Sequence, residues 1–76
     1  MKEIELKNRV IKWLSKMNTT VMSRPHEFTA QEVATAVEGY AGSVGRVAKD
    51  VINELNARGI SVEYRNNLTP RRFILT

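Results

Sequence analysis

Apolar side chains recur along the chain at two different spacings, and the spacing changes near residue 60. In the first part an apolar residue returns every three or four positions, at Leu6, Val10, Trp13, Leu14 and Met17. The same spacing returns later, at Val44, Val47, Ala48, Val51, Ile52 and Leu55. Each pattern is typical of the buried face of an amphipathic helix. The sequence therefore predicts helices over about residues 2–17 and 44–58.

A shorter helix is predicted over about residues 30–38, from the residues at its start. The Thr29 side chain can accept a hydrogen bond from the amide of Glu32, and the Glu32 side chain can accept one from the amide of Thr29. This reciprocal arrangement is a capping box. Phe28 and Val33 occupy the positions of a hydrophobic staple, the apolar pair that fixes the angle at which the chain enters a helix.

The boundaries of the last helix are also predicted. Only residues 39–42 separate it from the preceding helix, and Ser43 is its expected N-cap. So short a connection makes the two helices pack as neighbours at a steep angle, as in a helix-turn-helix unit. The helix should end at Arg58, because Gly59 can adopt the left-handed conformation and Ile60 is placed to touch Leu55.

Strands are predicted in two regions. Near the C-terminus, the apolar residues Ile60, Val62 and Tyr64 alternate with polar residues. Residues 66–70 then connect this half-buried strand to a returning strand over 71–76, in which Phe73 and Leu75 face inward. Upstream, residues 19–22 have strand propensity. Pro25 restricts the backbone of the residue before it to an extended conformation. A further short strand is therefore expected at either 20–22 or 26–28.

Three helices followed by a terminal hairpin, at these spacings, resemble the winged helix-turn-helix family over nearly the whole chain. The resemblance implies an α+β fold: one domain over residues 1–76, with a C-terminal β-hairpin, the wing, over about 60–76. It also implies sequence-specific binding of double-stranded DNA, with the third helix in the major groove and the wing on the backbone or in the minor groove. Transcriptional regulation is the expected use. The alternatives are an architectural factor in phage or plasmid recombination or replication, and a protein-interaction module that does not bind DNA.

The distribution of charge agrees with a nucleic-acid partner. The chain has a net charge of +4 and a pI of 9.9. Residues 1–38 hold six basic and five acidic side chains, whereas residues 39–76 hold six basic and three acidic ones. No acid follows Glu63, so we expect Arg65, Arg71 and Arg72 to crowd the hairpin tip without acidic neighbours. A basic hairpin beside a polar helix face is typical of a nucleic-acid-binding protein; the alternative is a basic surface that only improves solubility.

The residues expected to contact DNA lie on the third helix and in the hairpin. Opposite the apolar stripe, a helical period places Arg46, Lys49 and Asn53 together. Arginine can pair with guanine and asparagine with adenine, each through two hydrogen bonds, and lysine can bind guanine or phosphate. The full set of expected DNA contacts is Ser43, Arg46, Lys49, Asn53, Arg65, Asn66, Asn67, Arg71 and Arg72.

Two features each allow two interpretations. Ile4 and Ile11 widen the apolar face of the first helix. The width either serves a three-helix core that covers this helix from several sides, or places Ile4 and Ile11 at the seam of a homodimer that binds two half-sites. Gly45 costs helix stability, about 1 kcal/mol relative to alanine. It is explained either by close approach of the helix backbone to DNA or by close packing against the preceding helix.

Several classes of function lack support in the sequence. His26, the only histidine, stands in a loop beside Pro25 and has no catalytic context, so no catalytic residue is assigned and no enzyme activity is expected. No metal-ligand spacing, cofactor motif or small-molecule site is found. The absence of cysteine suits a reducing cytoplasm. The N-terminus has no signal-peptide core and no apolar run is long enough for a membrane span, so a soluble cytoplasmic protein is expected.

Overall fold

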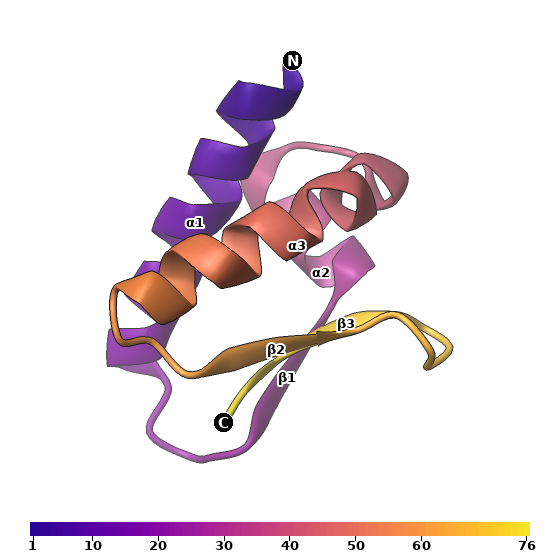
Figure 1. The fold of residues 1–76 in the computed structure, drawn as a ribbon. Helices are drawn as coiled ribbons and strands as arrows, with labels where there is room; N and C mark the ends of the chain where they lie inside the picture. Colours follow the sequence, from indigo (N-terminus) through magenta and orange to yellow (C-terminus); the bar gives the residue numbers. More distant parts are fainter.

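Three helices and three short strands follow one another along the chain. In a computed structural model that describes residues 1–76, helix α1 spans Glu3–Thr20 and is followed by strand β1, His26–Thr29. Helices α2, Ala30–Val37, and α3, Ala41–Ala57, come next (Figure 1). Strands β2, Val62–Arg65, and β3, Arg72–Leu75, complete the chain. The expected α+β class, with three helices and a terminal antiparallel hairpin, is confirmed.

The three strands form one antiparallel sheet in the order β1-β3-β2. Phe73 in the central strand β3 is paired with Phe28 on one side and with Tyr64 on the other. Since successive side chains of a strand point to opposite faces, these three aromatic residues share the face that meets the helices. The ring centroids of Tyr64 and Phe73 are 4.7 Å apart. This aromatic row is the sheet's contribution to the core.

Of the two positions considered for the upstream strand, 26–28 is confirmed and 20–22 is wrong. Thr19 and Thr20 instead belong to α1, which continues three residues beyond the predicted end. Their hydroxyls donate to the carbonyl of Lys16 at 2.8 and 2.9 Å. The backbone of residues 26–29 pairs with β3, so the strand forms where a long-range partner is present.

The core lies between the three helices and the inner face of the sheet. Its fully buried large side chains are Val10, Leu14, Val33, Val44, Val51, Leu55, Phe73 and Leu75. Ile11 belongs to this core, with only 4% of its surface exposed, whereas Ile4 is 62% exposed. Of the two interpretations of the wide apolar face, burial in the three-helix core is therefore confirmed for Ile11 and a dimer seam there is wrong, because α1 packs against both α2 and α3 and buries that side chain within a single chain.

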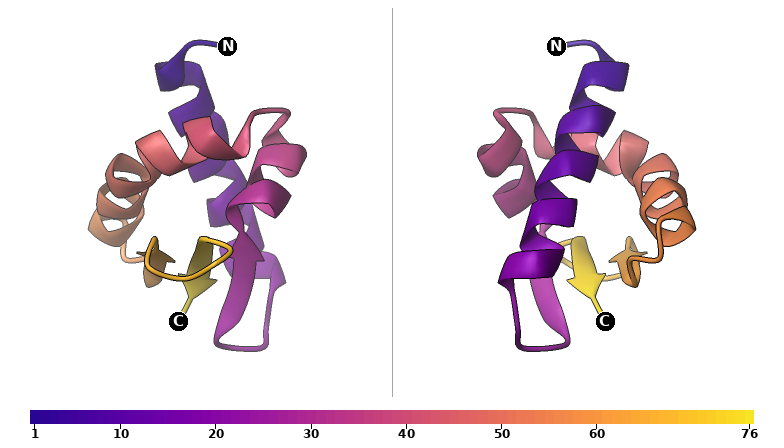
Figure 2. Two further views of the ribbon diagram at one scale, coloured as in Figure 1. Left: turned by 90° about the vertical axis from the view of Figure 1, so that its right-hand side faces the viewer. Right: turned by 90° about the vertical axis from the view of Figure 1, so that its left-hand side faces the viewer.

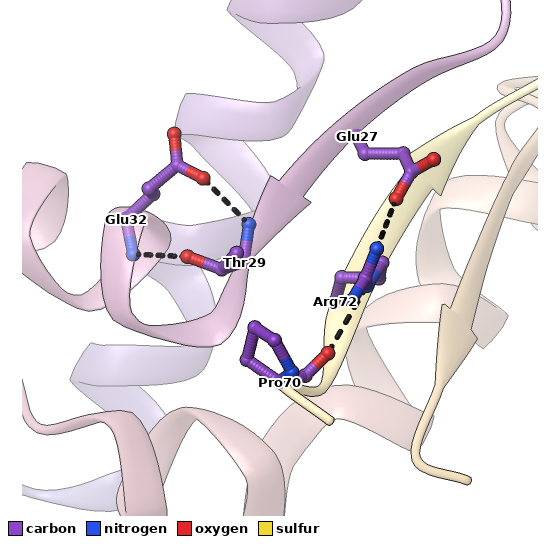
Figure 3. Close-up of polar contacts among 5 residues, drawn as sticks. All are labelled: Glu27, Thr29, Glu32, Pro70 and Arg72. Carbon is purple, nitrogen blue, oxygen red and sulfur yellow. Dashed lines mark hydrogen bonds and ion pairs between the residues drawn. The ribbon is translucent and has the colours of Figure 1, made fainter. Parts of the chain in front are cut away.

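The predicted start of α2 is confirmed in detail (Figure 3). The amide of Glu32 donates to Thr29 Oγ1 at 3.1 Å, and the amide of Thr29 donates to Glu32 Oε1 at 3.1 Å. Both bonds of the capping box are present. Phe28 and Val33, the expected staple pair, are both buried in the same core cluster.

Helix α3 begins earlier than expected, at Ala41, so Ser43 lies inside its first turn and is not its N-cap. Tyr40 holds the N-cap position, and its carbonyl accepts a hydrogen bond from the amide of Val44 at 2.9 Å. The turn between α2 and α3 is only Glu38–Tyr40. A side chain at Gly39 would put a Cβ atom 2.7 Å from Leu6 Cδ1, so glycine lets this turn pass close to α1.

The end of α3 follows the predicted glycine stop. Gly59 has a positive φ of 83°. Its amide donates to the carbonyl of Asn56, and the amide of Ile60 donates to the carbonyl of Leu55, both at 3.0 Å. These two bonds are those of a Schellman motif. Ile60 packs against the core, and the chain turns directly from α3 into the hairpin.

Candidate nucleic-acid interface

The outer face of α3 presents a row of unpaired polar side chains. Arg46, Lys49 and Asn53 are all exposed. They are three and four residues apart, so they are neighbours on one face of the helix. No hydrogen bond or ion pair within the chain engages the side chain of any of the three. Their donors and acceptors are therefore free to contact a partner molecule.

A cavity of about 310 Å³ lies between this helix face and the first strand of the hairpin. Lys49 and Asn53 line it from α3, and Asn66 lines it from the residue that follows β2. Gly45 and Tyr64 also line it. The structure thus brings together three of the expected contact residues, from two elements that are separate in the sequence.

Gly45 packs against the hairpin and not against α2. A Cβ atom at this position would lie 3.4 Å from the hydroxyl oxygen of Tyr64, and no other residue comes within 4 Å. Packing against the preceding helix is therefore wrong as the explanation of this glycine. The Tyr64 hydroxyl is buried and has no hydrogen-bond partner in the chain. A single Cβ atom would therefore just reach contact distance of this hydroxyl, whereas a longer side chain would crowd it.

The arginines of the hairpin differ from one another in their partners. Arg65 Nε donates to Glu63 Oε2 at 2.7 Å. Arg72 Nη1 donates to Glu27 Oε1 at 2.7 Å, and its Nε donates to the carbonyl of Pro70 at 3.0 Å (Figure 3). Arg71 alone is exposed and without an ion pair. The expectation of three arginines without acidic neighbours is wrong for Arg65 and Arg72, because strand geometry and strand pairing bring a carboxylate to each.

These arginines also occupy different surfaces. Arg65 and Arg72 face each other across β2 and β3. By the alternation of strand side chains, they lie on the outer face of the sheet, opposite the aromatic row that meets the helices. Arg71 and Asn67 are exposed in the connection between the strands. The expected contact residues therefore form two groups: one in the cleft between α3 and the hairpin, and one on the outer sheet and hairpin tip.

Two tyrosines at this interface are absent from the expected contact set. Tyr40 is 83% exposed at the N-cap of α3, and Tyr64 lines the cleft beside Gly45. Alternation in the hairpin predicts that Tyr64 faces inward, but no signal in the sequence places its hydroxyl against α3. Ser43, one of the expected DNA contacts, is partly buried in the first turn of α3.

No protein-family model, curated protein or solved structure matches this chain in comparisons with known proteins. None of its helices combines the length and the apolar character needed to cross a membrane.

Proposed function

We propose that this chain is a winged helix-turn-helix domain that binds double-stranded DNA in a sequence-specific manner and serves as a transcriptional regulator. In this proposal α3 enters the major groove, and the hairpin of β2 and β3, the wing, lies along the backbone or in the adjacent minor groove. The order of helices and strands along the chain and the sheet order β1-β3-β2 are compatible with this fold.

The observation that carries the proposal is the unpaired polar row on α3 beside the cleft to the wing. Arg46 and Asn53 each offer a side chain that can make two hydrogen bonds to one base, to guanine and adenine respectively. Lys49 can bind guanine or a phosphate. Because Lys49 and Asn53 share the cleft with Asn66, helix and wing can contact the same duplex at once.

The paired arginines limit the electrostatic part of binding. Arg65 and Arg72 already have carboxylate partners, so a phosphate contact adds little binding free energy at either. Arg71 and Lys49 are therefore the principal phosphate ligands in this proposal. Tyr40, at the exposed start of α3, can donate a hydrogen bond from its hydroxyl to a further phosphate oxygen. A small number of phosphate contacts predicts a modest dependence of affinity on salt.

The test is a selection of binding sites from random duplex DNA, followed by titrations of the enriched sequence and of an unrelated duplex. We expect one preferred sequence. Lys49→Ala should weaken binding, whereas Lys12→Ala, which removes the same charge from the exposed surface of α1, should have a much smaller effect. Equal losses in the two variants would mean that binding is only long-range attraction. Failure to enrich any sequence would contradict the sequence-specific proposal.

A further inference from the structure

A second surface lies between α1 and α2. In the left view of Figure 2, α2 and α3 lie on opposite sides of the molecule and α1 lies behind them. None of the outer-row residues of α3 lines this surface. It contains two open cavities of about 310 and 410 Å³, which share Trp13 and Ala36 as lining residues. We call these two neighbouring cavities together the α1–α2 groove.

The centre of this groove is apolar and held in place. Trp13 is only partly buried, and its ring packs edge-on against Phe28 with centroids 4.9 Å apart. Ala36 is exposed on the facing side of α2. Arg9 Nη1 donates to the carbonyl of Val37 at 3.3 Å, which fastens the last turn of α2 to α1. The groove is therefore preformed in the free chain.

Its two rims carry different charges. Arg9, Lys12 and Lys16 follow one another along the α1 rim, and none of them has a carboxylate partner. The α2 rim carries Glu32 and Glu38, and Glu32 keeps its negative charge in the capping box, because its partner there is a neutral backbone amide. The lining therefore holds three cations, all on α1, against two carboxylates on α2, so it is positive on balance and its positive charge is concentrated along α1.

We propose that the α1–α2 groove binds an acidic amphipathic helix of a partner protein. The apolar side chains of the partner helix fill the two cavities that Trp13 lines. The carboxylates of the partner helix lie over Arg9, Lys12 and Lys16. An amphipathic helix in an apolar groove is a recurrent mode of peptide recognition, tryptophan is enriched among residues that dominate binding energy, and charge complementarity selects and orients the partner. The proposal does not depend on DNA binding by α3.

The apolar centre argues against duplex DNA as the occupant, because a phosphate backbone would meet the cations and leave the indole and Ala36 without a complementary surface. A second copy of the chain is the other alternative. Met1 and Ile4 are exposed near Glu3 and Glu5 at the start of α1, so that segment has both apolar and acidic side chains. The experiment below separates these occupants.

Trp13 is the only tryptophan, so its fluorescence reports on the groove directly. The probes are two synthetic helical peptides of about 18 residues, about five turns, with leucine on one face. The other face is glutamate in one peptide and lysine in the second. We expect the glutamate peptide to shift the Trp13 emission and the amide resonances of α1 and α2, and the lysine peptide to leave both unchanged.

Variants at exposed positions test the two parts of the groove. Lys12→Gln with Lys16→Gln should weaken the glutamate peptide about threefold to tenfold, the range of a few exposed ion pairs. Ala36→Glu should abolish binding, because Ala36 lines both cavities and the new carboxylate would repel the glutamates of the peptide. Ala57→Glu adds the same charge to the exposed end of α3 and should bind as the parent does. Circular dichroism and thermal melts of each variant verify folding.

Several results would overturn the proposal. No response to the glutamate peptide at about 1 mM, where even a weak complex is populated, would remove the groove as a peptide site. Equal responses to both peptides would remove the acidic requirement. Self-association in sedimentation that Ala36→Glu abolishes would make a second copy the occupant. Resonance shifts of the α1 rim on adding duplex DNA, lost in the double lysine variant, would assign the cations to DNA instead.

Discussion

Glu27→Gln should increase the salt dependence of the proposed DNA binding, because it releases Arg72 from its carboxylate partner. In the free chain Arg72 and Glu27 are joined at 2.7 Å, and their side chains are 25% and 49% exposed. While the pair is intact, a phosphate that approaches Arg72 also meets the negative charge of Glu27. Glutamine keeps the shape of the side chain and removes that charge.

The magnitude follows from counterion release. Each phosphate newly neutralised steepens the plot of log affinity against log salt by about 0.9, so one released arginine should add up to about 0.9 to the slope. Arg71→Ala should lower the slope by about the same amount, since Arg71 has no ion pair. Arg72→Ala should lower it less. The stability cost of Glu27→Gln should stay below about 1 kcal/mol, because exposed ion pairs contribute little.

The assay is a fluorescence anisotropy titration of a selected duplex at several salt concentrations between about 50 and 200 mM. Glu5→Gln is the matched control, since it removes an exposed carboxylate without an ion pair from α1 and should leave the slope unchanged. If Glu27→Gln and the parent give the same slope while Arg71→Ala lowers it, the outer face of the sheet does not contact the duplex and only the hairpin tip does. If none of the variants changes the slope, the wing lies outside the interface.

Three further outcomes are expected. Arg46→Ala should change stability by no more than about 0.5 kcal/mol and cost about 1–3 kcal/mol on a preferred site, with relaxed preference at one base position; a uniform loss on all sequences would mean a phosphate contact. Gly45→Ala should stabilise the fold by up to about 1 kcal/mol in urea unfolding, because its Cβ would lie at contact distance, 3.4 Å, from the Tyr64 hydroxyl. Weaker DNA binding in that more stable variant would support close approach of α3 to DNA, and unchanged binding would contradict it. Thr29→Ala should cost about 1 kcal/mol, seen as a thermal midpoint lowered by about 4–8 °C; an unchanged midpoint would mean that the capping box does not stabilise the free chain.

Features that depend on residues close in the sequence were predictable. The capping box at Thr29 and Glu32 needs only residues three apart, and the Schellman end at Gly59 needs only the last turn of α3. The apolar stripes of α1 and α3 were predictable for the same reason, since helical periodicity is a local property. Some local predictions were wrong. Ser43 has the chemistry of an N-cap, but Tyr40 takes that position because the backbone can close the first turn without a side-chain cap. Residues 19 and 20 have strand propensity, but they belong to the last turn of α1.

The tertiary structure alone decided which side chains meet across elements. Glu27 and Arg72 are 45 positions apart and are joined only because β1 pairs with β3. The Tyr64 hydroxyl reaches Gly45 only because the hairpin packs against α3. Ile11 shows the same limit within α1: periodicity places it on a wide apolar face, but only the packing of α2 and α3 decides that it is buried while Ile4 is exposed. The sequence thus determined the three helices, the hairpin and their apolar faces. The position of β1 and the partners of charged and polar side chains depend on contacts that no local pattern specifies.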